Sequence, residues 1–146
     1  MTLNTAERRR WFADPQAARE LVAQIPTFFE SRHFAVVAYC LMPDHLHLVL
    51  EGTSEGADLR EVMRIWKQVT SHAWKNRGRG RLWQPGFHDR VLRECDDARG
   101  VVGYVVNNPV RAGLVTRMAD YPWTGSSRYT LEALAEHVGE WAPSWK

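Results

Sequence analysis

The fold of this chain is decided by the stretch FAVVAYCLMPDHLHLVL, residues 34–50. Residues 34–41 are apolar at every position, which is typical of a strand that is covered on both faces. Met42-Pro43-Asp44 predicts a turn, and residues 45–50 then return as a second, antiparallel strand. The stretch therefore predicts a β-hairpin at the centre of the fold.

Two histidines lie two residues apart on the second predicted strand. Side chains at positions i and i+2 leave a strand on the same face, so His45 and His47 point together to one side. Leu46, Leu48 and Leu50 point to the other side, where we expect them to be buried. Two imidazoles on a rigid element form half of a metal site. By itself, such a pair is more often a plain polar face, and the metal-site interpretation depends on further ligands elsewhere in the chain.

The chain has 146 residues, of which 45% are apolar and 11% aromatic. These values predict one globular domain over residues 1–146, and we expect residues 124–146 to be a variable C-terminal tail. The net charge is only +2, but basic residues crowd into residues 8–10 and 75–81. Such clusters favour a polyanion such as nucleic acid, although a solvated loop has the same composition.

Cysteine usage and hydropathy exclude several classes of protein. Cys40 and Cys95 lie far apart, so neither a disulfide framework nor a zinc knuckle is indicated. No apolar run reaches the length of a membrane-spanning helix, and the arginine-rich start does not resemble a secretory signal. We therefore expect a cytoplasmic protein without membrane association.

Three longer helices and a short one are predicted. Asp14-Pro15 is a favourable start for the first, and Pro26 is expected to kink or shorten it. The second begins at Asp58 and ends in the glycine- and arginine-rich run, and the third is capped by Asp96 or Asp97. A short strand is expected at residues 87–92 and a final helix at 131–138. The apolar stripe predicted for the second helix consists of Leu59, Val62, Trp66, Val69 and Ala73.

Tyr104 and Asn108 are four residues apart on the third predicted helix, so they share one of its faces. Pro109 places Asn108 in the last turn, because the residue before proline disfavours helical geometry. If this helix packs across the hairpin, a phenol, an amide oxygen and two imidazoles converge. Tyr104 as a packing residue and Asn108 as an ordinary helix end are the alternative interpretations.

This combination of groups suits phosphodiester cleavage. A divalent cation bound by two imidazoles and an oxygen donor keeps open positions, where it can polarise a phosphoryl oxygen. A phenol becomes a useful nucleophile when its proton is removed or weakened. Attack by tyrosine instead of water leaves a covalent phosphotyrosine and a free 3′ hydroxyl, so the bond energy is kept for rejoining.

Four motifs in this order resemble the single-tyrosine HUH transposases, in particular their REP-associated tyrosine transposase branch. The resemblance runs from about Arg9 to Trp123. The motifs are AYCLMPDHLHLVL at residues 38–50, LWQ at 82–84 with FHDRVL at 87–92, YVVNNPVRAGLV at 104–115, and YPW at 121–123.

The resemblance implies an α/β (α+β) fold, a ferredoxin-like sandwich with an antiparallel sheet and helices on one face. It implies that His45 and His47 are metal ligands, that Asn108 is the third ligand and that Tyr104 is the nucleophile. The expected activity is that of a DNA endonuclease and strand transferase, or transposase, using Mg²⁺ or Mn²⁺ and no nucleotide cofactor. The expected partner is single-stranded or hairpin DNA, and the protein is expected to be a monomer or homodimer.

Five arginines are candidates for DNA phosphate contacts, and ordinary surface charge is the alternative for each. They are Arg77, Arg79, Arg81, Arg90 and Arg111. Trp83 and Phe87 lie beside the basic run, where they are suited to stacking on unpaired bases, but we expect at least one of them to belong to the core.

The start of the chain departs from the family pattern. Family members usually begin with a β-strand that lies centrally in the sheet, whereas residues 1–7 here are few and polar. This predicts that the first strand is missing, through truncation, a rearranged sheet or pairing donated by a neighbour. A second departure, the looser spacing of Trp123-Thr124-Gly125-Ser126-Ser127, is expected to affect only the tail.

The main alternative function is a domesticated module that binds hairpin DNA without cutting it, which a missing first strand would favour. A histidine-bound zinc hydrolase is a third possibility, but His72 and His88 are isolated and provide no ligand spacing.

Overall fold

The computed structural model describes residues 1–92 and 97–138. Cys95 and Asp96, which figured in the sequence predictions, lie outside these residues. The elements in chain order are β1 (Thr2–Asn4), η1 (Ala6–Arg8), η2 (Trp11–Ala13), α1 (Pro15–Glu30), β2 (Phe34–Met42), β3 (His45–Gly52), α2 (Leu59–Lys75), α3 (Ala98–Val106), α4 (Asn108–Arg111), η3 (Met118–Asp120), β4 (Thr124–Gly125) and α5 (Leu131–Val138).

The predicted hairpin is confirmed as the centre of an antiparallel sheet with the order β1-β3-β2-β4. β2 and β3 pair along their whole length, from Met42 opposite His45 to Phe34 opposite Gly52. The register shifts between Val36 and Ala38, which is the mark of a β-bulge. A two-residue turn at positions 43–44 joins the two strands and leads directly into His45.

The prediction that the first strand is missing is wrong. Residues 2–4 pair antiparallel with β3 as β1. On its other side, the Thr2 N–H donates to the His88 carbonyl (2.7 Å), the His88 N–H donates to the Thr2 carbonyl (3.0 Å), and the Gln84 N–H donates to the Asn4 carbonyl (2.9 Å). Residues 2–4 stay in the sheet because both edges of this short strand are hydrogen-bonded and the side chain of Leu3 is only 1% exposed.

β1 thus lies centrally, between β3 and the segment 84–88. Helix α1 connects β1 to β2, and α2 connects β3 to the segment 84–88. The spatial order of these four extended segments, 84–88, β1, β3 and β2, is that of a ferredoxin-like fold. Residues 87–92 do not form the regular strand that was expected, because only an isolated bridge at His88 is present in the described part of this segment.

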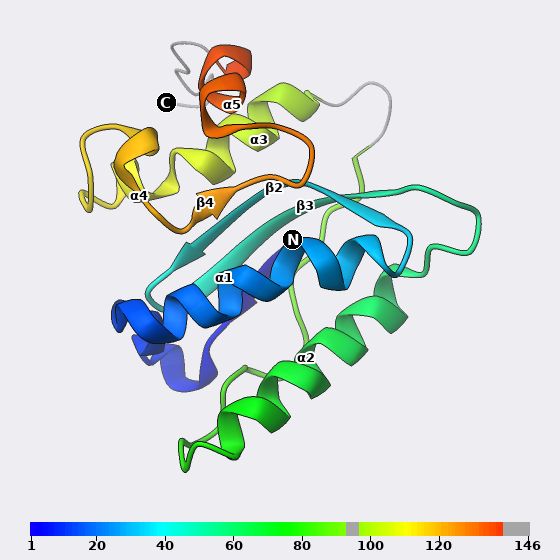
Figure 1. Ribbon diagram of the computed structural model, residues 1–146, viewed down its shortest axis with the longest axis vertical. Helices are drawn as coiled ribbons and strands as arrows, with labels where there is room; N and C mark the ends of the chain where they lie inside the picture. Colours follow the sequence, from blue (N-terminus) through cyan, green and yellow to red (C-terminus); the bar gives the residue numbers. More distant parts are fainter. Residues whose placement is uncertain (93–96, 139–146) are drawn as a thin grey trace.

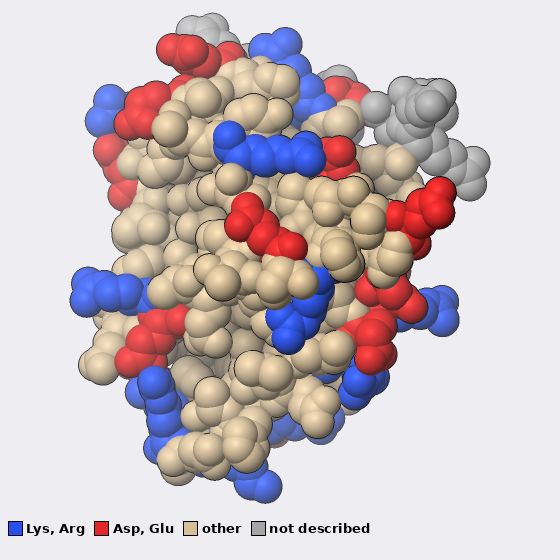
Figure 2. All heavy atoms as spheres, turned by 45° about the vertical axis from the view of Figure 1, so that its right-hand side comes forward, with Lys and Arg blue, Asp and Glu red and all other residues tan. Residues whose placement is uncertain are grey.

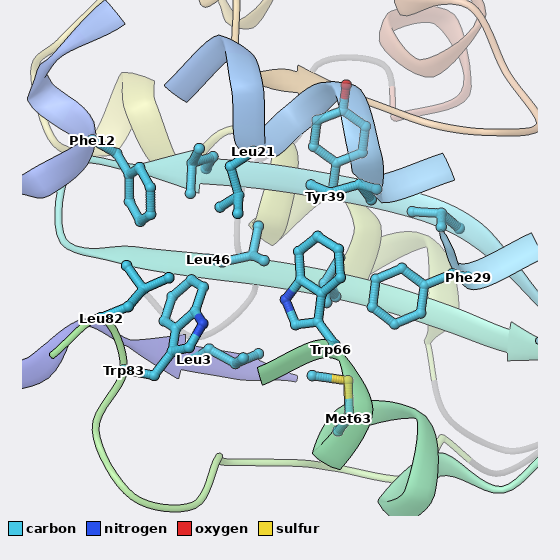
Figure 3. Packing of buried hydrophobic residues seen from close by; sticks show 14 of the residues in the cluster. Leu3, Phe12, Leu21, Phe29, Tyr39, Leu46, Met63, Trp66, Leu82 and Trp83 are labelled. Atoms are coloured by element: carbon cyan, nitrogen blue, oxygen red, sulfur yellow. The ribbon is translucent and has the colours of Figure 1, made fainter. Parts of the chain in front are cut away.

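The helices cover both faces of the sheet, which corrects the expectation of helices on one face only (Figure 1). α1 and α2 bury the face that carries Leu46 and Leu48 (Figure 3). α3 and α5 bury the opposite face, which carries Ala38 and Cys40. The alternation of side chains along β3 therefore separates the leucines from the histidines, as the sequence predicted.

Two details of the helices differ from the sequence predictions. α1 continues through Pro26 to Glu30, because Ile25 and Phe29 on either side of the proline are completely buried and their packing outweighs the lost hydrogen bond. In α2, Val69 is 43% exposed, while the neighbouring Thr70 is buried. The buried stripe of α2 consists of Val62, Met63, Trp66, Thr70 and Trp74.

Part of the expected C-terminal tail is built into the fold. Thr124 and Gly125 pair with β2 as β4. The Ser127 N–H donates to the Val36 carbonyl (2.8 Å), and the Ser126 hydroxyl donates to the same carbonyl (3.1 Å). Helix α5 follows and packs in the second core. In the part of the chain that the structure describes, no helix is long and apolar enough to cross a membrane.

Candidate active site

The four residues predicted to act together converge on the α3 face of the sheet. The rings of His45 and His47 lie 4.7 Å apart and nearly perpendicular. The Tyr104 ring lies 6.2 Å from the His47 ring and meets it edge to face. The amide nitrogen of Asn108 is 3.2 Å from Nε2 of His45. Residues more than 50 positions apart in the sequence thus form one cluster of polar groups.

A break in the helical backbone brings Asn108 to the histidines. α3 ends at Val106, Asn107 lies outside helical geometry, and a separate short helix begins at Asn108. The expectation of one continuous helix through Asn108 is therefore corrected. The cause is Pro109, which has no N–H to donate to the Val105 carbonyl and whose ring would clash with that carbonyl, so α3 cannot continue and a new helix starts with the proline in its first turn. Tyr104 and Asn108 still approach the same pair of imidazoles.

Hydrogen bonds orient both imidazoles. His45 Nδ1 lies 2.7 Å from a carboxylate oxygen of Asp44, and His47 Nδ1 lies 2.9 Å from the hydroxyl of Thr2. Because Nδ1 of each ring is engaged, Nε2 is the nitrogen that remains for a ligand. The sequence analysis missed both partners. Asp44 was detectable as a carboxylate next to a histidine, whereas Thr2 gave no local signal because only the pairing of β1 with β3 brings it to His47.

The electrostatics of the site keep His47 neutral and Asp44 charged. Burial, together with the nearby His45, lowers the pKa of His47 to about 3. Burial alone would raise the pKa of Asp44, but hydrogen bonds from His45 and Arg8 outweigh it and hold the pKa of this carboxyl below its ordinary value. A neutral imidazole is the form that binds metal ions.

The donor set fits a divalent cation, although it is not rich in charge. Within residues 1–92 and 97–138, no group of three His, Cys, Asp or Glu side chains is placed to hold a metal ion. The candidate donors are instead the imidazoles of His45 and His47 and the Asn108 amide. Turning that amide by 180° exchanges its nitrogen and oxygen, so Oδ1 can take the place that Nδ2 occupies beside His45. Imidazole nitrogens suit divalent transition-metal ions, and an amide oxygen suits Mg²⁺ and Mn²⁺. Three such donors leave coordination positions open.

Arg111 holds the candidate nucleophile. Its guanidinium lies over the Tyr104 ring, 3.8 Å from the ring centre, and Nη1 donates to the Tyr104 carbonyl (2.7 Å). Tyr104 itself is 39% exposed. Arg90 lines a cavity together with Val49 of β3 and Val102 of α3.

The basic run at the end of α2 is not part of this site. Arg77 forms an ion pair with Glu20 of α1, and Arg79 lies 3.4 Å from Asp14. These contacts place the run, including Arg81, in the α1–α2 layer, across the sheet from α3 (Figure 1). On the face shown in Figure 2, basic and acidic side chains lie beside one another and form no continuous basic field.

The two aromatic residues beside this run belong to the hydrophobic core. Trp83 is 2% exposed, and its indole N–H donates to the hydroxyl of Thr70 (2.9 Å). Phe87 is partly buried against the same cluster. The prediction that at least one of them is a core residue is confirmed.

Comparison with known proteins gives the same assignment as the motifs. A family model described as "Transposase IS200 like" matches residues 1–108. The REP-associated tyrosine transposase of Escherichia coli K12 is 29% identical over 103 residues, 70% of this chain and 61% of that protein. A relative from Haemophilus influenzae is 28% identical over 107 residues, 65% of this chain and 60% of the relative. The chain thus spans about three fifths of the length of these curated relatives.

A solved structure agrees with both the fold and the family. It is described as a REP-associated tyrosine transposase bound to a REP hairpin, and it matches with a TM-score of 0.69 and 27% sequence identity. The match covers 84% of this chain and 72% of that chain. Together with the family model, which covers more than half of the sequence, it shows that the chain belongs to the IS200-like transposase family.

Proposed function

We propose that this protein is a transposase that cuts and rejoins single-stranded DNA through a 5′-phosphotyrosine at Tyr104. The observation that carries the proposal is the convergence of an exposed tyrosine with two oriented imidazoles and an amide. Membership of the IS200-like transposase family supports it.

The reaction is a displacement at phosphorus. The Tyr104 oxygen forms a bond to the scissile phosphorus while the bond from phosphorus to the 3′ oxygen breaks. The phenol loses its proton and the departing 3′ oxygen gains one. Attack by a DNA 3′ hydroxyl then reverses these steps and releases the tyrosine. Arg111, stacked on the ring, holds Tyr104 beside His47 throughout.

His45 and His47, through Nε2, and Asn108, through Oδ1, would hold Mg²⁺ or Mn²⁺. When bound, the cation supplies Lewis-acid polarisation of a phosphoryl oxygen. The chain's own contribution is orientation: Asp44 and Thr2 fix the two rings through Nδ1.

We propose hairpin DNA as the partner, because the solved relative is described as bound to a REP hairpin. Arg111, beside the nucleophile, is the best placed of the predicted phosphate contacts, and Arg90 is a second candidate. Arg77 and Arg79 have weaker support, since each faces a carboxylate of this chain. Arg81 stays a prediction, as do the monomeric or homodimeric state and the cytoplasmic location.

The deciding experiment is a covalent trapping assay. Single-stranded oligonucleotides with a REP-like hairpin, labelled at the 5′ or 3′ end, are incubated with the protein and Mg²⁺ or Mn²⁺ and then separated under denaturing conditions. We expect a metal-dependent protein–DNA band that retains the label 3′ of the cut. Tyr104→Phe removes the band. Tyr129→Phe is the matched control, because Tyr129 is also exposed (44%) and lies outside the site.

Other outcomes identify the alternatives. Tight hairpin binding without any adduct would indicate the domesticated, non-catalytic module; the main reason for expecting that module, a missing first strand, has been removed by the structure. Cleavage that survives in Tyr104→Phe would indicate attack by water and overturn the tyrosine mechanism.

A further inference from the structure

The turn that leads into His45 is held by hydrogen bonds from a segment near the start of the chain. The N–H and the hydroxyl of Thr5 both donate to the Asp44 carbonyl (3.0 Å each). The N–H of Phe12 donates to the Pro43 carbonyl (3.0 Å). Residues 5–12 thus wrap around the two-residue turn, which lies immediately before the predicted metal ligands.

The side chain of Arg8 adds further contacts to this turn. Its Nε and Nη2 contact Oδ2 of Asp44 (3.0 and 2.9 Å), while Nη1 donates to the side-chain oxygen of Asn4 (2.8 Å). The other carboxylate oxygen of Asp44, Oδ1, contacts His45 Nδ1 (2.7 Å). The two oxygens of one carboxylate therefore have different partners, and a chain of contacts runs from Arg8 through Asp44 to His45.

The backbone of Arg8 has the left-handed conformation, with φ 54°, and so does that of Glu7, with φ 56°. Residues with a Cβ rarely adopt it, and it persists only where the surrounding structure over-determines it. Here the fork of the guanidinium between Asp44 and Asn4 helps to hold the strained turn in place. Strain that is retained beside a reactive centre points to a role in that centre.

We propose that Arg8 is a positioning residue of the active site, which acts by fixing Asp44 and through it the imidazole of His45. The inference rests on the proposed function, because it assigns Arg8 to the site that would hold the cation. For Arg8, this positioning role takes the place of the general binding of a polyanion that the sequence suggested for the basic residues 8–10. Arg9 differs from Arg8, since it pairs with Glu7 and lies over the Trp11 ring.

The exposed fractions of the side chains support an orienting role for the Arg8–Asp44 ion pair. The side chain of Arg8 is 50% exposed, that of Asp44 25% and that of His45 15%, so the contacts lead inward from solvent to the site. A half-exposed ion pair adds little to stability. Its loss is therefore expected to leave the protein folded, and an effect on metal binding can then be measured cleanly.

The test compares Arg8→Gln and Asp44→Asn with the control Arg10→Gln. Arg10 is an exposed member of the same arginine run, so its variant loses the same charge. Mn²⁺ affinity is measured by calorimetry on metal-free protein, hairpin DNA affinity in EDTA, and folding by thermal denaturation. Removing partners of metal-binding histidines weakens metal affinity by roughly 10- to 100-fold. We expect this range for Asp44→Asn, because an amide has one oxygen for two partners, and about tenfold for Arg8→Gln.

Two further readouts separate positioning from phosphate contact. In Arg8→Gln, saturating Mn²⁺ is expected to restore most of the rate of adduct formation, and Arg8→Lys is expected to be intermediate because lysine lacks the planar fork. Arg10→Gln is expected to keep the Mn²⁺ affinity of the parent protein.

The inference is overturned if Arg8→Gln binds Mn²⁺ as tightly as the parent and loses DNA affinity to the same extent as Arg10→Gln. Arg8 would then be one phosphate contact among several. A parent protein that binds no Mn²⁺ and forms no adduct would overturn the proposed function together with this inference, so the two failures are distinguishable.

Discussion

The two faces of the sheet are built from the same hairpin but do different work. The face under α1 and α2 buries large side chains: the rings of Trp66 and Phe29, whose centres lie 5.2 Å apart, belong to one core cluster with Leu46 and Leu48 (Figure 3). The face under α3 buries Ala38, Cys40 and Met42 of β2, of which the first two have small side chains. On this second face the polar pair His45 and His47 replaces the leucines.

This difference shows how the fold separates stability from chemistry. Large apolar side chains bury most of the hydrophobic area, so the α1–α2 face supplies most of the stability. Small side chains on the other face let α3 approach closely enough for Tyr104 to contact the His47 ring. Substitutions on the two faces are therefore expected to have different effects on unfolding and on activity.

The largest effect on stability is expected from Trp66→Ala. Trp66 is completely buried at the centre of the first core, and its removal leaves a large cavity. We expect the free energy of unfolding to fall by about 3–5 kcal/mol, measured by urea denaturation. Val69→Ala, on the same helix but 43% exposed, is the control and should cost far less. A loss below about 1 kcal/mol for Trp66→Ala would contradict the assignment of the core.

A smaller effect is expected from Gly125→Ala, which tests whether residues 124–127 belong to the fold. A Cβ at this position would lie 2.6 Å from Oη and 2.8 Å from Cζ of Tyr39, whose ring is buried. We expect a loss of about 1–3 kcal/mol from this overpacking. Gly80→Ala is the control, because its Cβ would meet no atom within 4 Å. Equal stability of both variants would show that β4 contributes little.

The third prediction concerns alkaline pH and the second core. Burial raises the pKa of the Cys40 thiol to about 12 from an ordinary value of 9.0. Between these values the folded state keeps a proton that the unfolded state has lost, so this contribution to stability is complete below pH 9 and falls as the pH rises. The slope approaches about 1.4 kcal/mol for each pH unit well above pH 9, and the expected loss between pH 9 and pH 10 is about 1 kcal/mol.

Denaturation curves between pH 9 and pH 10 check this slope. Cys40→Ala should flatten the pH dependence, while Tyr129→Phe, which removes an exposed phenol, should leave it unchanged. If the slope survives in Cys40→Ala, another group must be responsible for the alkaline sensitivity.

The smallest effect on stability is expected from Tyr104→Phe. The tyrosine is 39% exposed, and the contacts of Arg111 with its ring and its backbone carbonyl survive in phenylalanine. We expect a change within about 0.5 kcal/mol in thermal denaturation, together with complete loss of the covalent adduct. A strongly destabilised variant would mean that the site also serves the fold.

Much of the arrangement could be predicted from local sequence. The alternation in residues 45–50 separated His45 and His47 from the leucines, and Asp14-Pro15 and Asp58 marked helix starts that the structure confirms. The errors arose where packing overrides local preference. Helix α1 continues through Pro26 because the residues around the proline are buried. In α2, Thr70 faces the core in place of the adjacent Val69, so the buried stripe differs from the predicted one.

By itself, the sequence determined the hairpin, the face that each histidine occupies and the identity of the four candidate site residues, because strand alternation and helical spacing are local properties of the chain. Only the tertiary structure decided that residues 2–4 form a central strand, that Thr2 and the Arg8–Asp44 pair orient the imidazoles, and that the arginines following α2 lie on the far face. These outcomes depend on pairing between segments 36 or more residues apart, whose free energy no local pattern encodes.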